Sequence, residues 1–462
     1  MTREPDSETY RVIVFARDGG EIFLRRSKAG LHFPEVSILQ CRRVAENVGA
    51  EMKKHWGVEI VCLFELPSPL GSTRARYMVA KHWRTSGNAV PIAQWIPLRD
   101  VSEVSFAEPD DHSIMRESFA RCSVSFSDTD IGPFTRLNWF EELCQWVEGA
   151  IMPMELHLTG NFIQLSACPT FSLIRFETNG SAVWFKAVGA PNRDEFAITL
   201  KLAELLPNFL PTVVRARKDW NGWLAIEANG RELSATTDMG LWEIAAESLA
   251  RLQIESLRMV NEVRASGART LSTVGLSAVV RPFFDAMAQL MEQQTKMPPP
   301  ILSKQEIRLL QERILDYLAR LQDLGIPDAL GHLDLNPGNI IVSFPCCTFL
   351  DWAEAYVGYP FFTFQYLLEH FRRTFGADSV TESRLIKAYA QRWEGVLASK
   401  VINEGLLFSP PLAILAYAAG NDTWSDQQRL KDHALPGYMR GLTRRMLREA
   451  NLLSNRGLPC MS

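Results

Sequence analysis

The stretch GHLDLNPGNIIV, residues 331–342, holds three chemically different polar side chains close together, those of His332, Asp334 and Asn339. A Pro-Gly pair lies between the acid and the amide and predicts a sharp turn just before the apolar strand NIIV. We expect this turn to direct the side chains of Asp334 and Asn339 into one cleft. Taken singly, each of these residues is most simply a turn or cap residue, so the interpretation depends on the neighbouring sequence.

A further acidic position follows shortly afterwards. The stretch TFLDWAEA, residues 348–355, predicts a short apolar strand that ends at Asp351. Transfer of a phosphoryl group from ATP requires a cation for the phosphates, oxygen ligands for magnesium and a carboxylate that orients the acceptor hydroxyl. Asp334, Asn339 and Asp351 supply the oxygen-bearing members of that set. Together, these three residue types favour phosphotransfer over three unrelated turns.

The segments HLDLNPGN, FLDWAEA and GYPFF together resemble the aminoglycoside phosphotransferase-like kinases, whose catalytic loop reads His-x-Asp-x-x-x-x-Asn. The resemblance covers about residues 137–450. It implies that Asp334 is the catalytic carboxylate and that Asn339 and Asp351 are magnesium ligands. It also implies that His332 fixes the loop by hydrogen bonding.

The same resemblance assigns residues in the preceding β-rich segment. It implies that Lys186, in the apolar run VWFKAV, contacts the nucleotide phosphates. A buried lysine needs a partner, and the family places a glutamate on the following helix, which here is Glu195. The segment WLAIEANG is expected to offer backbone groups around Ile226, Glu227 and Ala228 to the adenine edge.

Two departures from the family pattern accompany these matches. The hairpin ETNGSA has a single glycine, which excludes the three-glycine lid of protein kinases. Leu333 stands where the family usually has glycine, and this change is expected to alter loop packing without removing a polar group.

The first 130 residues predict a hairpin at Asp18-Gly19-Gly20, a helix in CRRVAENVGAEMKKHWGV and a strand in EIVCLFEL. This order resembles the Nudix fold, whose signature helix carries magnesium-binding carboxylates. Aligned with that signature, Glu51 and Gly57 are retained. Lys54 and His55 replace the two metal-binding acids, and a lysine would repel magnesium. The resemblance therefore implies a Nudix-like module without hydrolase activity.

The resulting fold class is α+β. We expect a protein-kinase-like bilobal fold, with a small β-rich N-lobe and a large helical C-lobe, preceded by the Nudix-like α/β/α domain. The expected domains are 1–130 for the Nudix-like module, 137–230 for the N-lobe and 231–462 for the C-lobe.

Composition restricts the classes of function. Hydrophobic residues at 47% and charged residues at 22% are typical of a globular chain. A formal net charge of -4 without a polybasic run argues against nucleic acid or an anionic membrane as partner. The eight cysteines include no CxxC pair, and the polar start MTREPDSETYRVIV does not resemble a signal peptide. No uninterrupted apolar run reaches membrane-spanning length, so the expected location is the cytoplasm.

These observations predict an ATP- and Mg²⁺-dependent kinase that phosphorylates a hydroxyl group of a small molecule, with GTP as an alternative donor. An aminoglycoside, an amino sugar and another metabolite all remain open as acceptors, and Glu354, Asp422 and Asp426 are candidates for the acceptor pocket. The alternative is a binding or scaffold protein in which both halves have lost catalysis. The retained Asp334, Asn339 and Asp351 favour the enzyme. The oligomeric state is left open.

Overall fold

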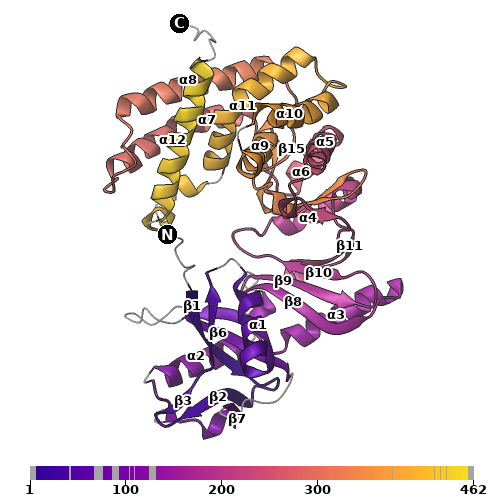
Figure 1. Ribbon diagram of the computed structural model, residues 1–462, viewed down its shortest axis with the longest axis vertical. Coiled ribbons are helices and arrows are strands. Elements are labelled where there is room, and N and C mark those ends of the chain that lie inside the picture. The colour runs from indigo at the N-terminus through magenta and orange to yellow at the C-terminus, as the bar shows by residue number, and fades with distance from the viewer. Residues whose placement is uncertain are drawn as a thin grey trace. The chain divides into compact units, whose positions relative to one another are not determined.

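The computed structural model describes residues 7–40, 43–66, 76–85, 93–102, 105–108, 110–123, 132–376, 378–420, 422–426, 428–432 and 434–455. The chain divides into two compact units (Figure 1). Unit 1 comprises residues 1–196 and 212–227, and unit 2 comprises residues 197–211 and 228–462. The expected division into three domains stays a prediction.

A seven-stranded mixed sheet forms the N-terminal part of unit 1. Its strands are β1 (Ser7–Phe15), β2 (Glu21–Ser27), β3 (Gly30–His32), β4 (Glu35–Leu39), β5 (Val58–Leu66), β6 (Arg76–Thr85) and β7 (Ala93–Pro97). The order is β3-β2-β1-β6-β5, with β4 paired to β1 and β7 paired to β2. Strand β1 is antiparallel to β2 and parallel to β6, and the predicted hairpin at residues 18–20 is confirmed.

Two helices lie on opposite faces of this sheet. They are α1 (Val44–Trp56) and α2 (Asp111–Ser123). Alternate residues of a strand point to opposite faces. Val12 of β1 shares a hydrophobic cluster with α1, whereas Phe15 shares one with α2. This part of unit 1 is therefore layered α/β/α, and the expected Nudix-like assignment stays a prediction. Helix α1 ends where Gly57 adopts a φ of 65°, a conformation that glycine reaches without steric cost.

A five-stranded antiparallel sheet forms the rest of unit 1. It contains β8 (Leu158–Cys168), β9 (Phe171–Thr178), β10 (Val183–Ala187), β11 (Val213–Arg217) and β12 (Gly222–Ile226), in the order β11-β12-β10-β9-β8. Helix α3 (Trp139–Ile151) precedes it, and α4 (Glu195–Leu205) begins in unit 1 and continues in unit 2. The apolar face of α3 is buried with residues from both sheets, so the two sheets share one hydrophobic core.

A buried glutamine joins the two sheets. The side chain of Gln164, in β8, accepts a hydrogen bond of 2.8 Å from the Cys62 backbone N–H in β5. Its amide donates a bond of 2.9 Å to the Cys62 carbonyl. One side chain therefore satisfies two buried backbone groups of the N-terminal sheet. Because these contacts are buried, the N-terminal sheet is an integral part of unit 1.

We expect Gln164→Ala to destabilise the chain by about 2–4 kcal/mol, since each orphaned buried polar group costs about 1–3 kcal/mol. The measurement is urea unfolding followed by circular dichroism. Gln94→Ala, at an exposed position of β7, is the matched control and should change the unfolding free energy by less than about 0.5 kcal/mol. Equal effects of the two substitutions would contradict the joining role of Gln164.

Unit 2 is mainly helical (Figure 1). Its helices are α5 (Met239–Ser256), α6 (Val260–Ala265), α7 (Thr273–Glu292), α8 (Lys304–Asp323), α9 (Phe361–Phe375), α10 (Ser379–Trp393), α11 (Ser399–Ala419) and α12 (Ala434–Asn455). Two small sheets have the orders β13-β16-β17 and β14-β18-β15. Their strands are β13 (Arg231–Glu232), β14 (Arg269–Leu271), β15 (Ala329–His332), β16 (Ile340–Val342), β17 (Cys347–Phe349) and β18 (Ala355–Gly358). The capping box predicted for α8, between Ser303 and Glu306, is confirmed.

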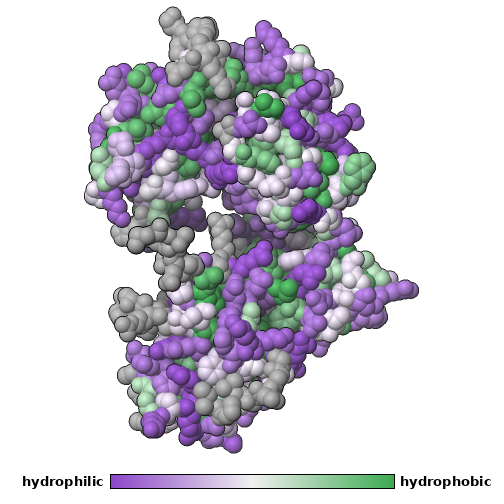
Figure 2. All heavy atoms as spheres, in the orientation of Figure 1, coloured by the Kyte–Doolittle hydropathy of each residue, from purple (hydrophilic) through white to green (hydrophobic). Residues whose placement is uncertain are grey.

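Helix α11 is an exception to the expectation that no segment is long and apolar enough to span a membrane. Among the described helices it alone is long and apolar enough to do so by length and composition. However, 61% of the window that qualifies is buried inside the protein, as in the core helix of a globular unit. Figure 2 shows hydrophilic residues interspersed with smaller hydrophobic groups on the face that it draws.

Candidate functional site

The loop that carries Asp334 connects β15 with β16 through a single 3₁₀ turn, η8 (Pro337–Asn339). The side-chain amide of Asn339 donates a hydrogen bond of 3.0 Å to the Asp334 carbonyl. The Asn339 carbonyl in turn accepts one of 2.9 Å from the Leu350 N–H. The loop is thus joined directly to the segment that contains Asp351. The amide bond to Asp334 uses the nitrogen of the Asn339 side chain, so its oxygen is the atom suited to a metal ion.

His332 is buried and links both ends of this arrangement. Its Nδ1 accepts a hydrogen bond of 3.1 Å from the Asp334 N–H. The other ring nitrogen, Nε2, lies 3.1 Å from the Leu350 carbonyl and therefore donates to it. These two bonds specify a neutral imidazole with the proton on Nε2. They support the role of His332 as the residue that fixes the loop.

Burial lowers the pKa of His332, although the carboxylates of Asp351, Asp334 and Glu354 act in the opposite direction. The unfolded chain therefore binds a proton more readily than the folded protein once the pH falls below about 6.5. We expect stability to fall with pH in that range, by up to about 1.4 kcal/mol per pH unit from this one group. No such loss arises above pH 6.5.

The measurement is urea unfolding between pH 5 and pH 8 for the wild type and His332→Gln. Burial also lowers the pKa values of His32, His82 and His370, so only the difference between the two proteins isolates His332. The variant should be less stable at pH 7.5 but should lose less stability on acidification. If the unfolding free energy of the two proteins had the same slope against pH, His332 would not be the source of the pH dependence.

Asp351 is exposed and precedes the 3₁₀ turn η9 (Trp352–Glu354). Its backbone has φ 62° and ψ 65°, in the left-handed region that few residues other than glycine, asparagine and aspartate adopt. The next residue, Trp352, is buried, and its ring lies 5.0 Å from the ring of His332. The tight turn therefore keeps the carboxylate at the surface while the tryptophan anchors the segment.

Tyr366 is a site residue that the sequence analysis missed. Its hydroxyl, from α9, donates a hydrogen bond of 2.9 Å to Oδ1 of Asp334. This bond engages Oδ1 and not the second carboxylate oxygen, Oδ2. Tyr366, His370 and Arg373 recur at helical spacing in FFTFQYLLEHFRRTF, and this polar stripe was the available signal.

Of the three acids suggested for an acceptor pocket, two have local partners. Glu354 forms an ion pair with Arg269. The Asp426 carboxylate accepts a hydrogen bond of 2.9 Å from the Gln428 N–H. The side chain of Asp422 lies outside the described residues. The role of these three positions in an acceptor pocket therefore stays a prediction.

The predicted partner of Lys186 is confirmed. Lys186, in β10, forms an ion pair with Glu195 at the start of α4. The side chain of Glu195 is only 1% exposed and that of Lys186 is 13% exposed. The ammonium lies 5.8 Å from the ring centre of Trp223 and 5.9 Å from that of Phe171. A buried carboxylate and two aromatic rings thus hold the ammonium in place.

The backbone of the expected adenine-binding segment is partly engaged. The Ile226 N–H donates to the Thr212 carbonyl, and the Glu227 N–H donates to the Ala182 carbonyl, each at 2.9 Å. Neither N–H is available to a base. Of the backbone groups predicted to bind the base at these two residues, only the carbonyl oxygens remain candidates. Ala228 begins the next stretch of unit 2.

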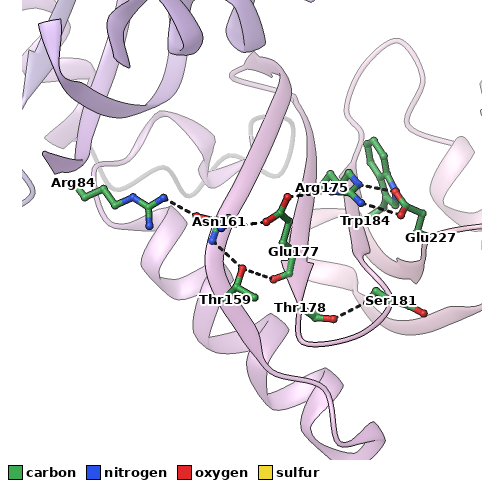
Figure 3. Close-up of polar contacts among 9 residues, drawn as sticks. All are labelled: Arg84, Thr159, Asn161, Arg175, Glu177, Thr178, Ser181, Trp184 and Glu227. Carbon is green, nitrogen blue, oxygen red and sulfur yellow. Dashed lines mark hydrogen bonds and ion pairs between the residues drawn. The ribbon is translucent and has the colours of Figure 1, made fainter. Parts of the chain in front are cut away.

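The side chain of Glu227 belongs to a chain of polar contacts across unit 1 (Figure 3). Arg175 donates two hydrogen bonds to it, of 2.6 and 3.0 Å, and these lower the pKa of Glu227. Arg175 also pairs with Glu177, which accepts a bond of 3.1 Å from Asn161. Arg84, in β6, reaches Asn161 at 2.7 Å. The N-terminal sheet is thus linked through polar side chains to the end of β12.

In α1, the carboxylate of Glu51 contacts two side chains of the following turn. Glu51 lies 3.4 Å from the Lys54 ammonium and 2.8 Å from Nε2 of His55. Within the described ranges, no group of three or more His, Cys, Asp or Glu residues is placed to hold a metal. The pair Asn339 and Asp351 has the oxygen donors that magnesium prefers, and magnesium commonly takes its remaining ligands from phosphates and water. These two residues therefore fit the ion that phosphotransfer requires.

Comparison with known proteins gives a family match over part of the chain. No curated protein matches significantly. Solved structures that match include macrolide 2'-phosphotransferase from Brachybacterium faecium, at 17% identity and a TM-score of 0.42, covering 70% of this chain and 100% of that one. Ethanolamine kinase from Plasmodium vivax matches at 15% identity and a TM-score of 0.47, covering 76% and 97%. The GDP complex of aminoglycoside 2'-phosphotransferase-IIIa matches at 16% identity and a TM-score of 0.43, covering 68% and 99%. Residues 192–399, which contain Asp334, Asn339 and Asp351, match the model of the phosphotransferase enzyme family.

Proposed function

We propose that the protein transfers the γ-phosphoryl group of ATP, or of GTP, to a hydroxyl group of a small molecule in a magnesium-dependent reaction. One observation carries the proposal. Within the family match, the loop of Asp334 and Asn339 is hydrogen-bonded through Leu350 to the segment of Asp351. The three side chains that phosphotransfer requires thus belong to one connected piece of structure.

The reaction breaks the bond between the γ-phosphorus and the oxygen that bridges it to the β-phosphate, and forms a bond from the acceptor oxygen to the same phosphorus. Asp334 orients the acceptor hydroxyl and accepts its proton, and the nucleoside diphosphate leaves. Tyr366 holds Oδ1 of Asp334, which directs Oδ2 toward the acceptor. Asn339 and Asp351 would hold magnesium, which would neutralise charge on the phosphates.

Lys186 is proposed as the phosphate-binding cation, with Glu195 as the residue that positions it. The ion pair between them supports this role. We propose that the adenine edge meets carbonyl oxygens of Ile226 and Glu227, since their N–H groups are already engaged, together with Ala228.

The architecture proposed for this function is a protein-kinase-like N-lobe at residues 137–230 and C-lobe at 231–462, working in the cytoplasm. Residues 1–130 are proposed as a Nudix-like module without hydrolase activity. The contacts of Glu51 with Lys54 and His55 support that loss. The N-terminal module then serves as structural support for the adjacent sheet, to which Gln164 joins it.

Magnesium-dependent nucleotide binding tests the proposal. Thermal unfolding is measured with ATP, GTP or neither, each with and without Mg²⁺, for the wild type and Lys186→Met. We expect nucleotide with Mg²⁺ to raise the melting temperature of the wild type and to have a much smaller effect on the variant. A wild type that shows no magnesium-dependent shift with either nucleotide would reject the proposal in favour of a binding or scaffold protein.

A further inference from the structure

A cavity of about 260 Å³ opens in unit 2 beside the candidate catalytic carboxylate. Leu333, from the loop of Asp334, and Tyr366, from α9, both line it. Helices α11 and α12 contribute Tyr417 and Tyr438. Because the Tyr366 hydroxyl is bonded to Oδ1 of Asp334, the wall of the cavity is connected directly to the candidate catalytic group.

One side of this cavity is aromatic. The rings of Tyr366 and Tyr417 are stacked, with centres 6.0 Å apart. The Tyr438 hydroxyl donates a hydrogen bond of 3.1 Å to the Tyr417 hydroxyl. Tyr438 is 51% exposed, so it lies where the cavity meets solvent. The three rings offer a surface for the ring or carbon skeleton of a ligand.

The remaining side is cationic. Arg373 and Arg445 both contact one carboxylate, that of Glu369, at 3.2 and 2.8 Å. Nε of Arg445 is buried and has no hydrogen-bond partner among the described residues. Two guanidinium groups that share one carboxylate retain N–H donors for a second anion.

The other charged side chains at this cavity are already paired. Arg372 forms two hydrogen bonds with Glu382, of 2.8 and 2.5 Å. Glu449 is 3.1 Å from Arg448. Burial and the nearby Arg373 lower the pKa of His370, so its ring is uncharged near neutral pH. The uncompensated donors at this cavity therefore come from Arg373 and Arg445.

A cationic acceptor fits this lining poorly. An ammonium group approaching Glu369 would have to displace two guanidinium groups and would then lie beside them. An anionic group would be attracted to the same two guanidinium groups, since planar guanidinium groups bind carboxylates and phosphates through paired N–H donors. These charges favour an anion over an amino sugar or a polycation at this cavity on electrostatic grounds.

We propose that this cavity binds the acceptor and that the acceptor is an alcohol carrying a carboxylate or phosphate group. Arg445 and Arg373 hold the anion, the tyrosines contact the carbon skeleton, and the hydroxyl reaches Oδ2 of Asp334. The inference rests on the proposed phosphotransferase function and specifies its substrate class. The transfer step is the one described above.

The test is an ATP-consumption assay with acceptors matched in skeleton and different in charge. Glycolate is compared with ethanolamine, glycerate with glycerol, and ribose 5-phosphate with ribose; kanamycin is the polycation. We expect at least one anionic member to exceed its partner in kcat/KM by tenfold or more. The glycolate and glycerate arms report carboxylate recognition, and the ribose 5-phosphate arm reports phosphate recognition.

Substitution of the two arginines then tests whether the preference for anionic acceptors arises in this cavity. Arg373→Gln and Arg445→Gln should each raise KM for the anionic acceptor about tenfold, the size expected of one charge-assisted hydrogen bond of roughly 1.4 kcal/mol, and leave kcat within threefold. Arg308→Gln, on the exposed surface of α8, is the matched control and should change neither value. Arg373 is 58% exposed, so its variant remains informative if Arg445→Gln does not fold.

Two results would overturn the inference. One is a neutral or cationic member that equals or exceeds its anionic partner; the other is the absence of transfer to every anionic member while nucleotide binding persists. Either result leaves the proposed function standing, because magnesium-dependent nucleotide binding tests that function separately. An unchanged KM in both arginine variants would remove the cavity from the acceptor site.

Discussion

Asp334→Asn is expected to lower kcat for phosphoryl transfer by about 10²- to 10⁴-fold, the usual contribution of a positioned general base. The substitution removes the proton acceptor and changes little else. An asparagine oxygen still accepts the hydrogen bond from the Tyr366 hydroxyl, and the backbone contacts of the loop with His332 and Asn339 are preserved. Nucleotide binding, measured by thermal shift, should therefore remain.

The assay follows nucleoside diphosphate release with the best acceptor, at saturating ATP and Mg²⁺. Asp323→Asn, which neutralises an exposed carboxylate at the end of α8, serves as the matched control and should retain full activity. If Asp334→Asn keeps more than a third of the wild-type kcat, Asp334 is not the catalytic carboxylate.

Asp351→Asn is expected to raise the Mg²⁺ concentration for half-maximal activity by about 10- to 100-fold, a range typical of damage to a metal site. Asparagine is chosen over alanine because Asp351 has a φ of 62°, which asparagine tolerates and alanine does not. The substitution therefore removes one negative charge without adding backbone strain. Alanine would mix the two effects.

The measurement is a Mg²⁺ titration of activity, repeated as a thermal shift with ATP at each Mg²⁺ concentration. The binding signal separates loss of metal from loss of fold, since a misfolded variant would melt early at every concentration. Identical titration curves for Asp351→Asn and the wild type would exclude Asp351 as a magnesium ligand.

Local sequence predicts the elements that carry the candidate site. The Pro-Gly turn, the capping box at Ser303 and the hairpin at Asp18-Gly19-Gly20 all involve residues within a few positions of one another. Hydrogen bonds within such short segments form from backbone conformations that the residues themselves favour. The pairing of Lys186 with Glu195, nine residues apart, was likewise within reach of sequence comparison.

The segment proposed to bind adenine, residues 226–228, shows where reasoning from local sequence fails. Whether the N–H groups of Ile226 and Glu227 are available depends on their partners, the carbonyls of Thr212 and Ala182. Ala182 precedes α4 in the sequence, whereas Glu227 follows it. No local sequence pattern predicts the hydrogen bond between them. A sequence motif therefore indicates which residues approach a ligand but not which of their atoms remain unpaired.

By itself, the sequence of this protein predicted several of its turns, helices and strands and singled out the loop of Asp334 and Asn339 as a candidate for phosphoryl transfer. Only the tertiary structure brought Tyr366 to Asp334, 32 positions away, and joined Gln164 to Cys62, 102 positions away. It also placed Arg445 beside Glu369 in the cavity that we propose for an anionic acceptor. The physical reason is that turns and caps arise from neighbouring residues, whereas the lining of a cavity depends on how distant helices pack against one another.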